Sequence, residues 1–200
     1  MKLIRPVLLT ACLALACGLA AAAEPAAAPC PATWAKPVML AGVPNLHQVS
    51  PTLYRSAQPT RDGMAGLEKL GVRTVVNLRS FNSDRDELKG TKLAEAHLFM
   101  KAWHPERKEV IEFLKIATDP KQCPVLLHCQ HGADRTGTLA ASYRVIVQGW
   151  TKEEAIREMT DGGFGFHEVW KNLPEWIADL DVDAIRKQLG IPKPPATPIP

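Results

Sequence analysis

The residues best suited to chemistry lie between positions 128 and 137, in the order His-Cys-Gln-His-Gly-Ala-Asp-Arg-Thr-Gly. Cys129 supplies a nucleophile, and Arg135, six residues later, supplies a planar guanidinium that matches two oxygens of a phosphate group. Loop N–H groups, a helix N-terminus and Arg135 would together stabilise a thiolate at Cys129. A cysteine that ends a strand can also be a small buried apolar residue, but these neighbours favour nucleophilic attack at phosphorus.

An apolar strand and an apolar helix are expected to position these residues. Residues 125–127 form a continuous apolar run that is typical of a buried parallel strand, and residues 138–148 have the length and composition of a helix. Gly132 permits a tight loop between them, and the helix is expected to open near Arg135. The loop amides and the helix N-terminus would then converge on one anion-binding point.

The rest of the chain alternates expected strands with expected helices. Apolar and β-branched runs predict strands at 53–56, 72–78 and 98–102. Capping residues and apolar periodicity predict helices at 60–70, from Pro105 to 117, at 151–160, and twice within 168–189 with caps at Asn172 and Asp181. This alternation predicts an α/β fold with a central, mostly parallel sheet, helices on both faces, and ligands at the carboxyl ends of the strands.

The run His128-Cys129-x5-Arg135-Thr136-Gly137 resembles the signature of cysteine-dependent protein tyrosine and dual-specificity phosphatases. The resemblance extends from LYRSAQP at residues 53–59 to GGFGF at residues 162–166, and it is greatest to exported bacterial dual-specificity phosphatases. It implies a compact protein tyrosine phosphatase-like fold and the hydrolysis of phosphate monoesters, on phosphotyrosine and also on phosphoserine or phosphothreonine in proteins.

The resemblance also implies a role for each residue of the loop. Cys129 would form a phosphocysteine intermediate that water hydrolyses, and Thr136 matches the hydroxyl that hydrogen-bonds the departing sulfur. His128 and Gly137 would support the loop from behind. No metal or other cofactor is implied. The groups expected to bind the phosphate oxygens belong to Gln130, His131, Gly132, Ala133, Asp134 and Arg135.

The general acid departs from the family pattern, which places an aspartate on a loop a few tens of residues before the cysteine. No aspartate lies between His97 and Glu109. Glu106 is one alternative, although a carboxylate in the first turn of a helix often only complements the helix dipole. Asp134 is the other and is slightly favoured, although it is also a plausible helix cap. Myotubularin-like lipid phosphatases carry an aspartate at this place.

Three other functions remain open. An inositol phosphate or phosphoinositide phosphatase would use the same mechanism, but the loop carries no lysine to attract a polyanion. An RNA 5′-triphosphatase has a similar loop, but export argues against it. A catalytically silent phosphate-binding module has no need of a nucleophile, so intact Cys129, Arg135 and Thr136 argue against this class.

The length and composition predict one domain with flanking segments. Residues 1–23 are expected to be an export signal, because a basic start precedes an apolar stretch and a run of alanines. Lipidation at Cys17 is the alternative and would anchor the protein to a membrane, whereas simple cleavage would release it into the periplasm. The other expected segments are an Ala/Pro-rich linker at 24–44, the phosphatase domain at 45–190 and a Pro-rich tail at 191–200.

Charge and cysteines limit the partners. Without Lys2 and Arg5 the chain keeps 24 − 2 = 22 basic residues against 21 acidic ones, a net charge of +1. This balance gives no support to a nucleic-acid or membrane surface, so the expected partner is a phosphorylated protein or a small phosphoester. Cys30 and Cys123 can pair in an oxidising compartment, and the sequence leaves open whether they do.

Overall fold

A computed structural model describes residues 31–194 of the chain, and its centre is a six-stranded sheet. Strands β3, β6, β4 and β5 run parallel to one another, while β1 and β2 join β3 as antiparallel neighbours. The order across the sheet is β1 (Lys36–Pro37), β2 (His47–Ser50), β3 (Leu53–Ser56), β6 (Val125–His128), β4 (Thr74–Asn77) and β5 (Ala94–His97). The mostly parallel sheet is therefore confirmed.

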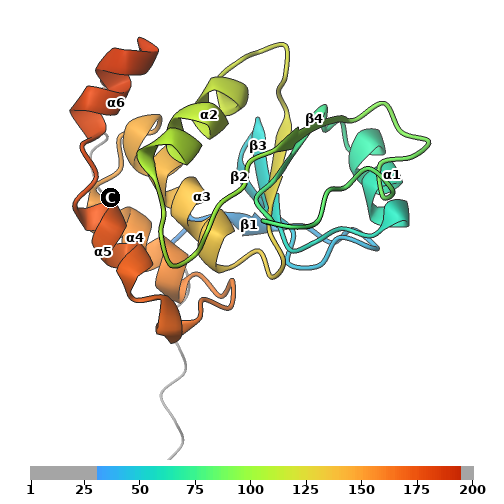
Figure 1. Ribbon diagram of the computed structural model, residues 1–200, viewed down its shortest axis with the longest axis horizontal. Coiled ribbons are helices and arrows are strands. Elements are labelled where there is room, and N and C mark those ends of the chain that lie inside the picture. The colour runs from blue at the N-terminus through green and yellow to red at the C-terminus, as the bar shows by residue number, and fades with distance from the viewer. Residues whose placement is uncertain (1–30, 195–200) are drawn as a thin grey trace, which may run out of the picture.

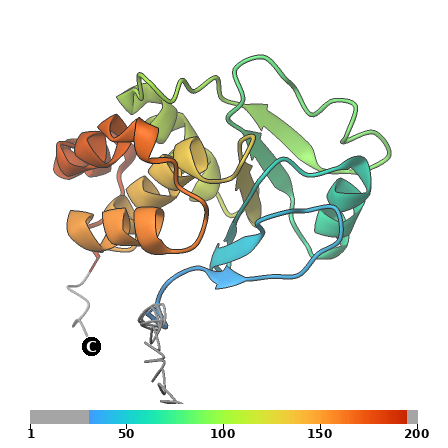
Figure 2. The same cartoon turned by 90° about the horizontal axis from the view of Figure 1, so that it is seen from below.

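Helices cover both faces of the sheet (Figures 1 and 2). Helix α1 (Arg61–Lys69) lies alone on one face, and the remaining helices lie on the other. They are α2 (Arg107–Ala117), α3 (Asp134–Ile146), α4 (Lys152–Asp161), the 3-10 turn η1 (Glu168–Trp170), α5 (Asn172–Ala178) and α6 (Val182–Leu189). The expected α/β fold with helices on both faces is confirmed.

The two faces explain the continuous apolar runs of the central strands. Successive side chains of a strand point to opposite faces. Leu126 accordingly packs with Met64 and Leu67 of α1, whereas Leu127 packs with Phe113 of α2 and Leu139 of α3. Because both faces are covered, both sets of side chains must be apolar.

Helix α3, which follows the central strand, is buried along nearly its whole length. It contacts α2, α4, α5 and α6. At Gly137 a Cβ atom would lie 3.0 Å from the Cγ atom of Met159, so the missing side chain lets α4 approach α3 closely. The start of this helix is thereby fixed between the sheet and four neighbouring helices.

The packed domain begins earlier than the boundary expected at residue 45. Strand β1 lies in the range expected as linker, and Val43 belongs to the core beside α1. The backbone N–H of Ala35 donates to the Glu158 carboxylate, which is itself paired with buried Arg144. The expected export signal at 1–23, Cys17 and Cys30 lie outside the described residues. Among residues 31–194, none of the helices combines the length and apolar character needed to cross a bilayer.

Three local expectations are wrong. The strand expected at 98–102 lies earlier in the chain, as β5 at Ala94–His97. The composition of β5 does not predict a strand, because Ala and Glu are poor strand formers. As an edge strand, β5 tolerates a charged side chain.

Helix α2 begins at Arg107, so Pro105 precedes its cap, and Asn172 lies inside α5. The caps expected at Thr60, Thr151 and Asp181 are confirmed, and each side chain accepts a backbone hydrogen bond.

Candidate active site

The loop between β6 and α3 lies at the carboxyl ends of the parallel strands. His128 is the last residue of β6, Cys129 follows it directly, and α3 begins at Asp134. Cys129 is only 2% exposed. Strand, short loop and helix start are arranged as the sequence predicts, so the cysteine lies at the edge of the sheet where parallel α/β folds bind ligands.

Donors from the N-terminal part of the chain hold the carbonyl groups of this loop. Three such bonds are Gln58 N to Gln130 O (3.3 Å), Asn45 Nδ2 to His131 O (3.0 Å) and Arg55 Nη2 to Gly132 O (2.8 Å). By contrast, no backbone N–H from residue 130 to 135 donates to an acceptor within residues 31–194. Because polar backbone groups need partners, these free N–H groups are available to bind an anion.

Gly132 lets the loop lie directly on the end of β3. Its φ is +71°, and a Cβ atom there would lie 2.5 Å from the carbonyl carbon of Ser56 and from the nitrogen of Ala57. The obstacle is backbone, which cannot rotate away as a side chain can. Only glycine therefore fits between the loop and β3.

Arg55 places a buried positive charge behind the loop. Its side chain is 1% exposed, donates to Gly132 O, and lies over the ring of Phe164 with 3.7 Å to the ring centre. Burial lowers the pKa of the Arg55 guanidinium to about 10, while the nearby charges of Glu158 and Cys129 oppose that shift. At neutral pH this group stays protonated, so a buried positive charge lies near the cysteine.

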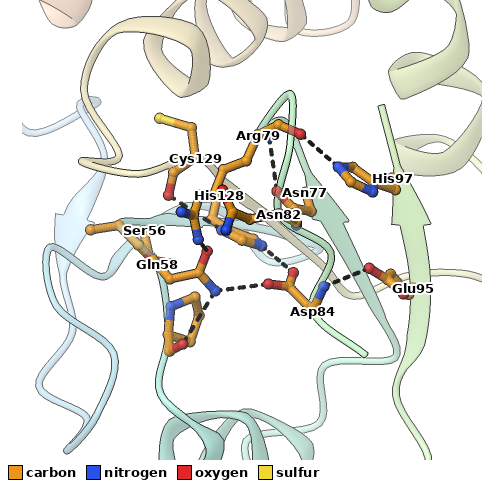
Figure 3. Close-up of polar contacts among 12 residues, drawn as sticks. Ser56, Gln58, Asn77, Arg79, Asn82, Asp84, Glu95, His97, His128 and Cys129 are labelled. Atoms are coloured by element: carbon orange, nitrogen blue, oxygen red, sulfur yellow. Dashed lines mark hydrogen bonds and ion pairs between the residues drawn. The ribbon is translucent and has the colours of Figure 1, made fainter. Parts of the chain in front are cut away.

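A buried pair of hydrogen-bonded side chains, His128 and Asp84, supports the loop from the other side (Figure 3). His128 Nε2 lies 2.6 Å from Asp84 Oδ2, and Gln58 Nε2 donates to Asp84 Oδ1 at 2.8 Å. Arg79 in turn donates to Gln58 Oε1 at 2.7 Å. Burial raises the pKa of the Asp84 carboxyl, but the hydrogen bonds and charge of His128, with Gln58 and Arg79, outweigh burial and leave that pKa below its ordinary value. Figure 3 shows the sulfur of Cys129 directed away from this network.

Sequence reasoning missed Asp84. This residue lies in the charged segment 83–92, whose sequence shows neither helical nor strand periodicity. The structure places it 44 residues from its partner in sequence but in direct contact with His128. No signal within a single sequence links two residues so far apart.

Arg135 and Thr136 open helix α3 beside the cysteine. Arg135 is partly exposed, and its Nη1 atom donates to Leu78 O at 3.3 Å. Thr136 Oγ1 is buried and has no hydrogen-bond partner in the described part of the chain. A buried hydroxyl without a partner is uncommon, so the Thr136 hydroxyl is available to a ligand.

The two carboxylates considered as general acid lie in different surroundings. Asp134 is 6% exposed, and its Oδ1 atom accepts a hydrogen bond from the backbone N–H of His167 at 3.0 Å. Glu106 caps α2 and pairs with Lys108 at 2.9 Å. The hydrogen bond and charge of Lys108 hold the pKa of Glu106 below its ordinary value. Of these two residues, only Asp134 belongs to the segment that follows the cysteine, where it is the first residue of α3.

His131, Asp134 and His167 form a group that sequence reasoning did not foresee. Their ligand atoms all lie within 4.8 Å of one another, which is a spacing that suits a metal ion. His167 Nδ1 lies 2.9 Å from Asp134 Oδ2. Histidine 167 follows the glycine-rich turn 162–166, 33 residues beyond Asp134, so only the folded chain brings the three together.

Comparison with known proteins assigns this chain to a family. Residues 41–171 match the family model of the DSP-PTPase phosphatase fused to NAD+ kinase. The dual specificity protein phosphatase TpbA of Pseudomonas aeruginosa is 40% identical over 169 residues, which cover 82% of this chain and 74% of that protein. The chain belongs to the dual-specificity phosphatase family.

A solved structure of the same relative and one further relative are also similar to this chain. A crystal structure of a serine variant of P. aeruginosa TpbA in complex with phosphotyrosine has a TM-score of 0.72 and 36% identity, and it covers 81% of this chain and 99% of that one. The inositol diphosphatase DSP5 of Arabidopsis thaliana is 28% identical over 123 residues, which cover 58% of this chain and 60% of that protein.

Replacing Gly132 tests the contact between the loop and β3. We expect Gly132→Ala to lower kcat/KM by about 100-fold, because the loop must move by roughly an ångström to clear the backbone of Ser56 and Ala57. Gly90→Ala is the matched control, since Gly90 also has a positive φ but meets nothing within 4 Å. Equal activity losses in both variants, measured on an aryl phosphate, would contradict this account of the loop.

Replacing Asp84 tests the buried pair through pH. Because folding lowers the pKa of Asp84, its stabilisation is present above the unfolded value of about 3.9 and is lost as pH falls through the folded value. We expect Asp84→Asn to lose about 1–3 kcal/mol of unfolding free energy at neutral pH, and the difference from the parent to shrink below about pH 4. Urea unfolding across this range measures it.

Asp179→Asn is the control for this experiment. Asp179 is exposed and has no side-chain hydrogen bond or ion pair within residues 31–194. Its replacement is expected to leave the unfolding free energy nearly unchanged at every pH. A pH-independent loss in Asp84→Asn would show that the variant lost packing rather than a charge interaction.

Proposed function

We propose that this phosphatase hydrolyses phosphotyrosine, and also phosphoserine and phosphothreonine, in proteins through a phosphocysteine intermediate. The observation that carries the proposal is the arrangement of the loop. The backbone N–H groups of 130–135 are free for an anion, and Cys129 begins the same loop. A buried cation, Arg55, lies behind them, and Arg135 is available in front. These groups match the charges of a phosphate under attack by sulfur.

The proposed reaction has two steps. In the first, the Cys129 sulfur attacks phosphorus, the bond from phosphorus to the ester oxygen breaks, and that oxygen leaves with a proton from the general acid. The loop amides and Arg135 stabilise the equatorial oxygens. In the second, water attacks phosphorus and gives a proton to the carboxylate of the same acid, the bond from phosphorus to sulfur breaks, and inorganic phosphate and the cysteine thiolate are released. The unpartnered hydroxyl of Thr136 is suited to hydrogen-bond the departing sulfur.

We assign the general acid to Asp134 rather than to Glu106. Asp134 is buried at the start of α3 beside Arg135, whereas Glu106 caps a different helix, α2, and its carboxylate pairs with Lys108. His167 contacts the Asp134 carboxylate and fixes its position. A general acid must lie within reach of the leaving oxygen, and of the two carboxyl groups only Asp134 begins the helix that follows Cys129.

The proposed substrate class rests on the surroundings of the loop and on the relatives. Exposed aromatic side chains at Phe81, Phe99 and Trp103 lie on segments that follow β4 and β5 at the same edge of the sheet. Such residues suit contact with a peptide around the phosphorylated residue. The relative TpbA is named a dual specificity protein phosphatase, and its serine variant binds phosphotyrosine.

An inositol phosphate is the second proposed substrate class. The inositol diphosphatase DSP5 is a relative, and the stretch from His97 to Glu109 lacks the aspartate expected of protein phosphatases. A phosphoanhydride needs less help from an acid than an ester does. Against this substrate, none of residues 128–137 is a lysine.

We place this activity outside the cytoplasm, in the periplasm. The support is the pattern of residues 1–23, in which Lys2 and Arg5 precede an apolar stretch and a run of alanines. Anchoring through lipidated Cys17 is the alternative.

The first test compares the parent with Cys129→Ser on an aryl phosphate, a phosphopeptide panel and inositol hexakisphosphate. We expect phosphopeptide turnover by the parent and a loss of at least about 10⁴-fold in Cys129→Ser, because a nucleophile is required in both steps. Preferred turnover of the inositol phosphate would favour the second substrate class. Activity that survives in Cys129→Ser would exclude the phosphocysteine route, and an inactive parent that still binds phosphate would indicate a binding module.

The second test identifies the acid by the leaving group. We expect Asp134→Asn to lower kcat by about 100-fold on alkyl phosphates, whose oxygen needs a proton, and far less on 4-nitrophenyl phosphate. Glu106→Gln is the matched control, because it also replaces a carboxylate by an amide, and it is expected to keep the parent's dependence on leaving-group pKa. A loss on alkyl phosphates in Glu106→Gln but not in Asp134→Asn would assign the acid to Glu106. If the dependence of kcat on leaving-group pKa were unchanged in both variants, neither residue would be the acid.

A further inference from the structure

We propose that His131, Asp134 and His167 bind a zinc-class divalent cation and that this cation reversibly inhibits the enzyme. The inhibition rests on the proposed function, whereas binding of the ion does not. Two imidazoles and one carboxylate form a donor set that suits Zn²⁺ and neighbouring transition metals. The three side chains come from the phosphate-binding loop and from the segment after α4, and their ligand atoms lie within 4.8 Å of one another.

The distances are close to those that a metal would require. Ligands at about 2.0–2.1 Å from a tetrahedral zinc lie roughly 3.3 Å apart, and the ring centres of two bound imidazoles lie roughly 5 Å apart. His167 Nδ1 and Asp134 Oδ2 are 2.9 Å apart, and the ring centres of His131 and His167 are 5.2 Å apart. His131 and His167 have exposed side chains, so a small rotation completes the site.

Asn45 holds the two backbone segments of this site together. Its Nδ2 atom donates to His131 O at 3.0 Å and to Phe164 O at 2.9 Å. Asn45 has a φ of +56°, a conformation that asparagine adopts more readily than most residues. The backbones that carry the two histidines are therefore fixed before any ion arrives, which reduces the entropy lost on binding.

Binding at this site would act directly on the reaction. The ion would take the place of the contact between His167 Nδ1 and Asp134 Oδ2, and the Asp134 carboxyl group, once bound to the ion, would no longer be free to protonate the leaving group. The ion would also link His131 in the loop to His167 and so restrict the movement of the loop. Its remaining coordination positions face solvent, where they could bind the product phosphate and slow its release. Both effects slow turnover, so the ion is expected to inhibit and a chelator to restore activity.

Calorimetry with Zn²⁺ tests binding without relying on activity. A thiolate is also a zinc ligand, so we start from Cys129→Ser, in which the nucleophile cannot bind the ion. We expect this variant to bind Zn²⁺, and the addition of His131→Ala or His167→Ala to weaken binding by at least about tenfold. His104→Ala in the same background is the control for loss of an exposed histidine and is expected to bind like its parent.

Three outcomes would overturn the proposal. Zinc binding that disappears in Cys129→Ser would show that the sulfur is the ligand. Binding that is unchanged by His131→Ala and His167→Ala would place the ion elsewhere, and absence of binding would remove the site. Thermal melts check that each variant is folded.

In activity assays Zn²⁺ is expected to inhibit the parent and to inhibit His167→Ala at least about tenfold less strongly. If the parent turns over no phosphoester, the proposed function fails while the calorimetry still reports on the site.

Discussion

The contact between the loop 129–133 and the end of β3 is the constraint on which the active site depends. Gly132 lies against the backbone of Ser56 and Ala57, and the loop carbonyls accept hydrogen bonds from behind. Turning the carbonyl groups away from the centre leaves the N–H groups free. The loop carbonyl groups thus have partners, whereas the loop N–H groups have none within residues 31–194. Unpaired N–H groups cost stability unless a ligand binds them, so this arrangement suits an anion.

Buried charges hold this arrangement in place. Arg55 lies behind the loop, Asp84 pairs with His128 beneath it, and Arg144 pairs with Glu158 between α3 and α4. A buried charge is costly unless it is paired and hydrogen-bonded, so each of these groups permits few alternative positions. Arg55 differs from the other buried charged residues, because its charge also interacts with Cys129. Support and electrostatics therefore come from the same residue.

The glycine-rich turn 162–166 and His167 complete the front of the site. Phe164 packs under Arg55, Asn45 ties the turn to the loop, and His167 contacts Asp134. This segment controls the surroundings of the carboxylate to which we assign acid catalysis. It also creates the group of three side chains that we propose as a metal site, so catalysis and inhibition would depend on the same carboxylate.

The sequence by itself determined the strand, loop and helix around Cys129, because these depend on local composition and spacing. It also determined the mostly parallel sheet, through the alternation of strand and helix patterns, and the phosphatase family, through the residues that resemble the family signature. The tertiary structure alone decided which distant residues support the loop. Asp84, Asn45 and His167 lie 44, 86 and 33 residues from the groups that they contact. The edge strand β5 was likewise misplaced, since strand pairing rather than propensity defines it. Contacts of this kind form only when elements pack, so no local pattern encodes them.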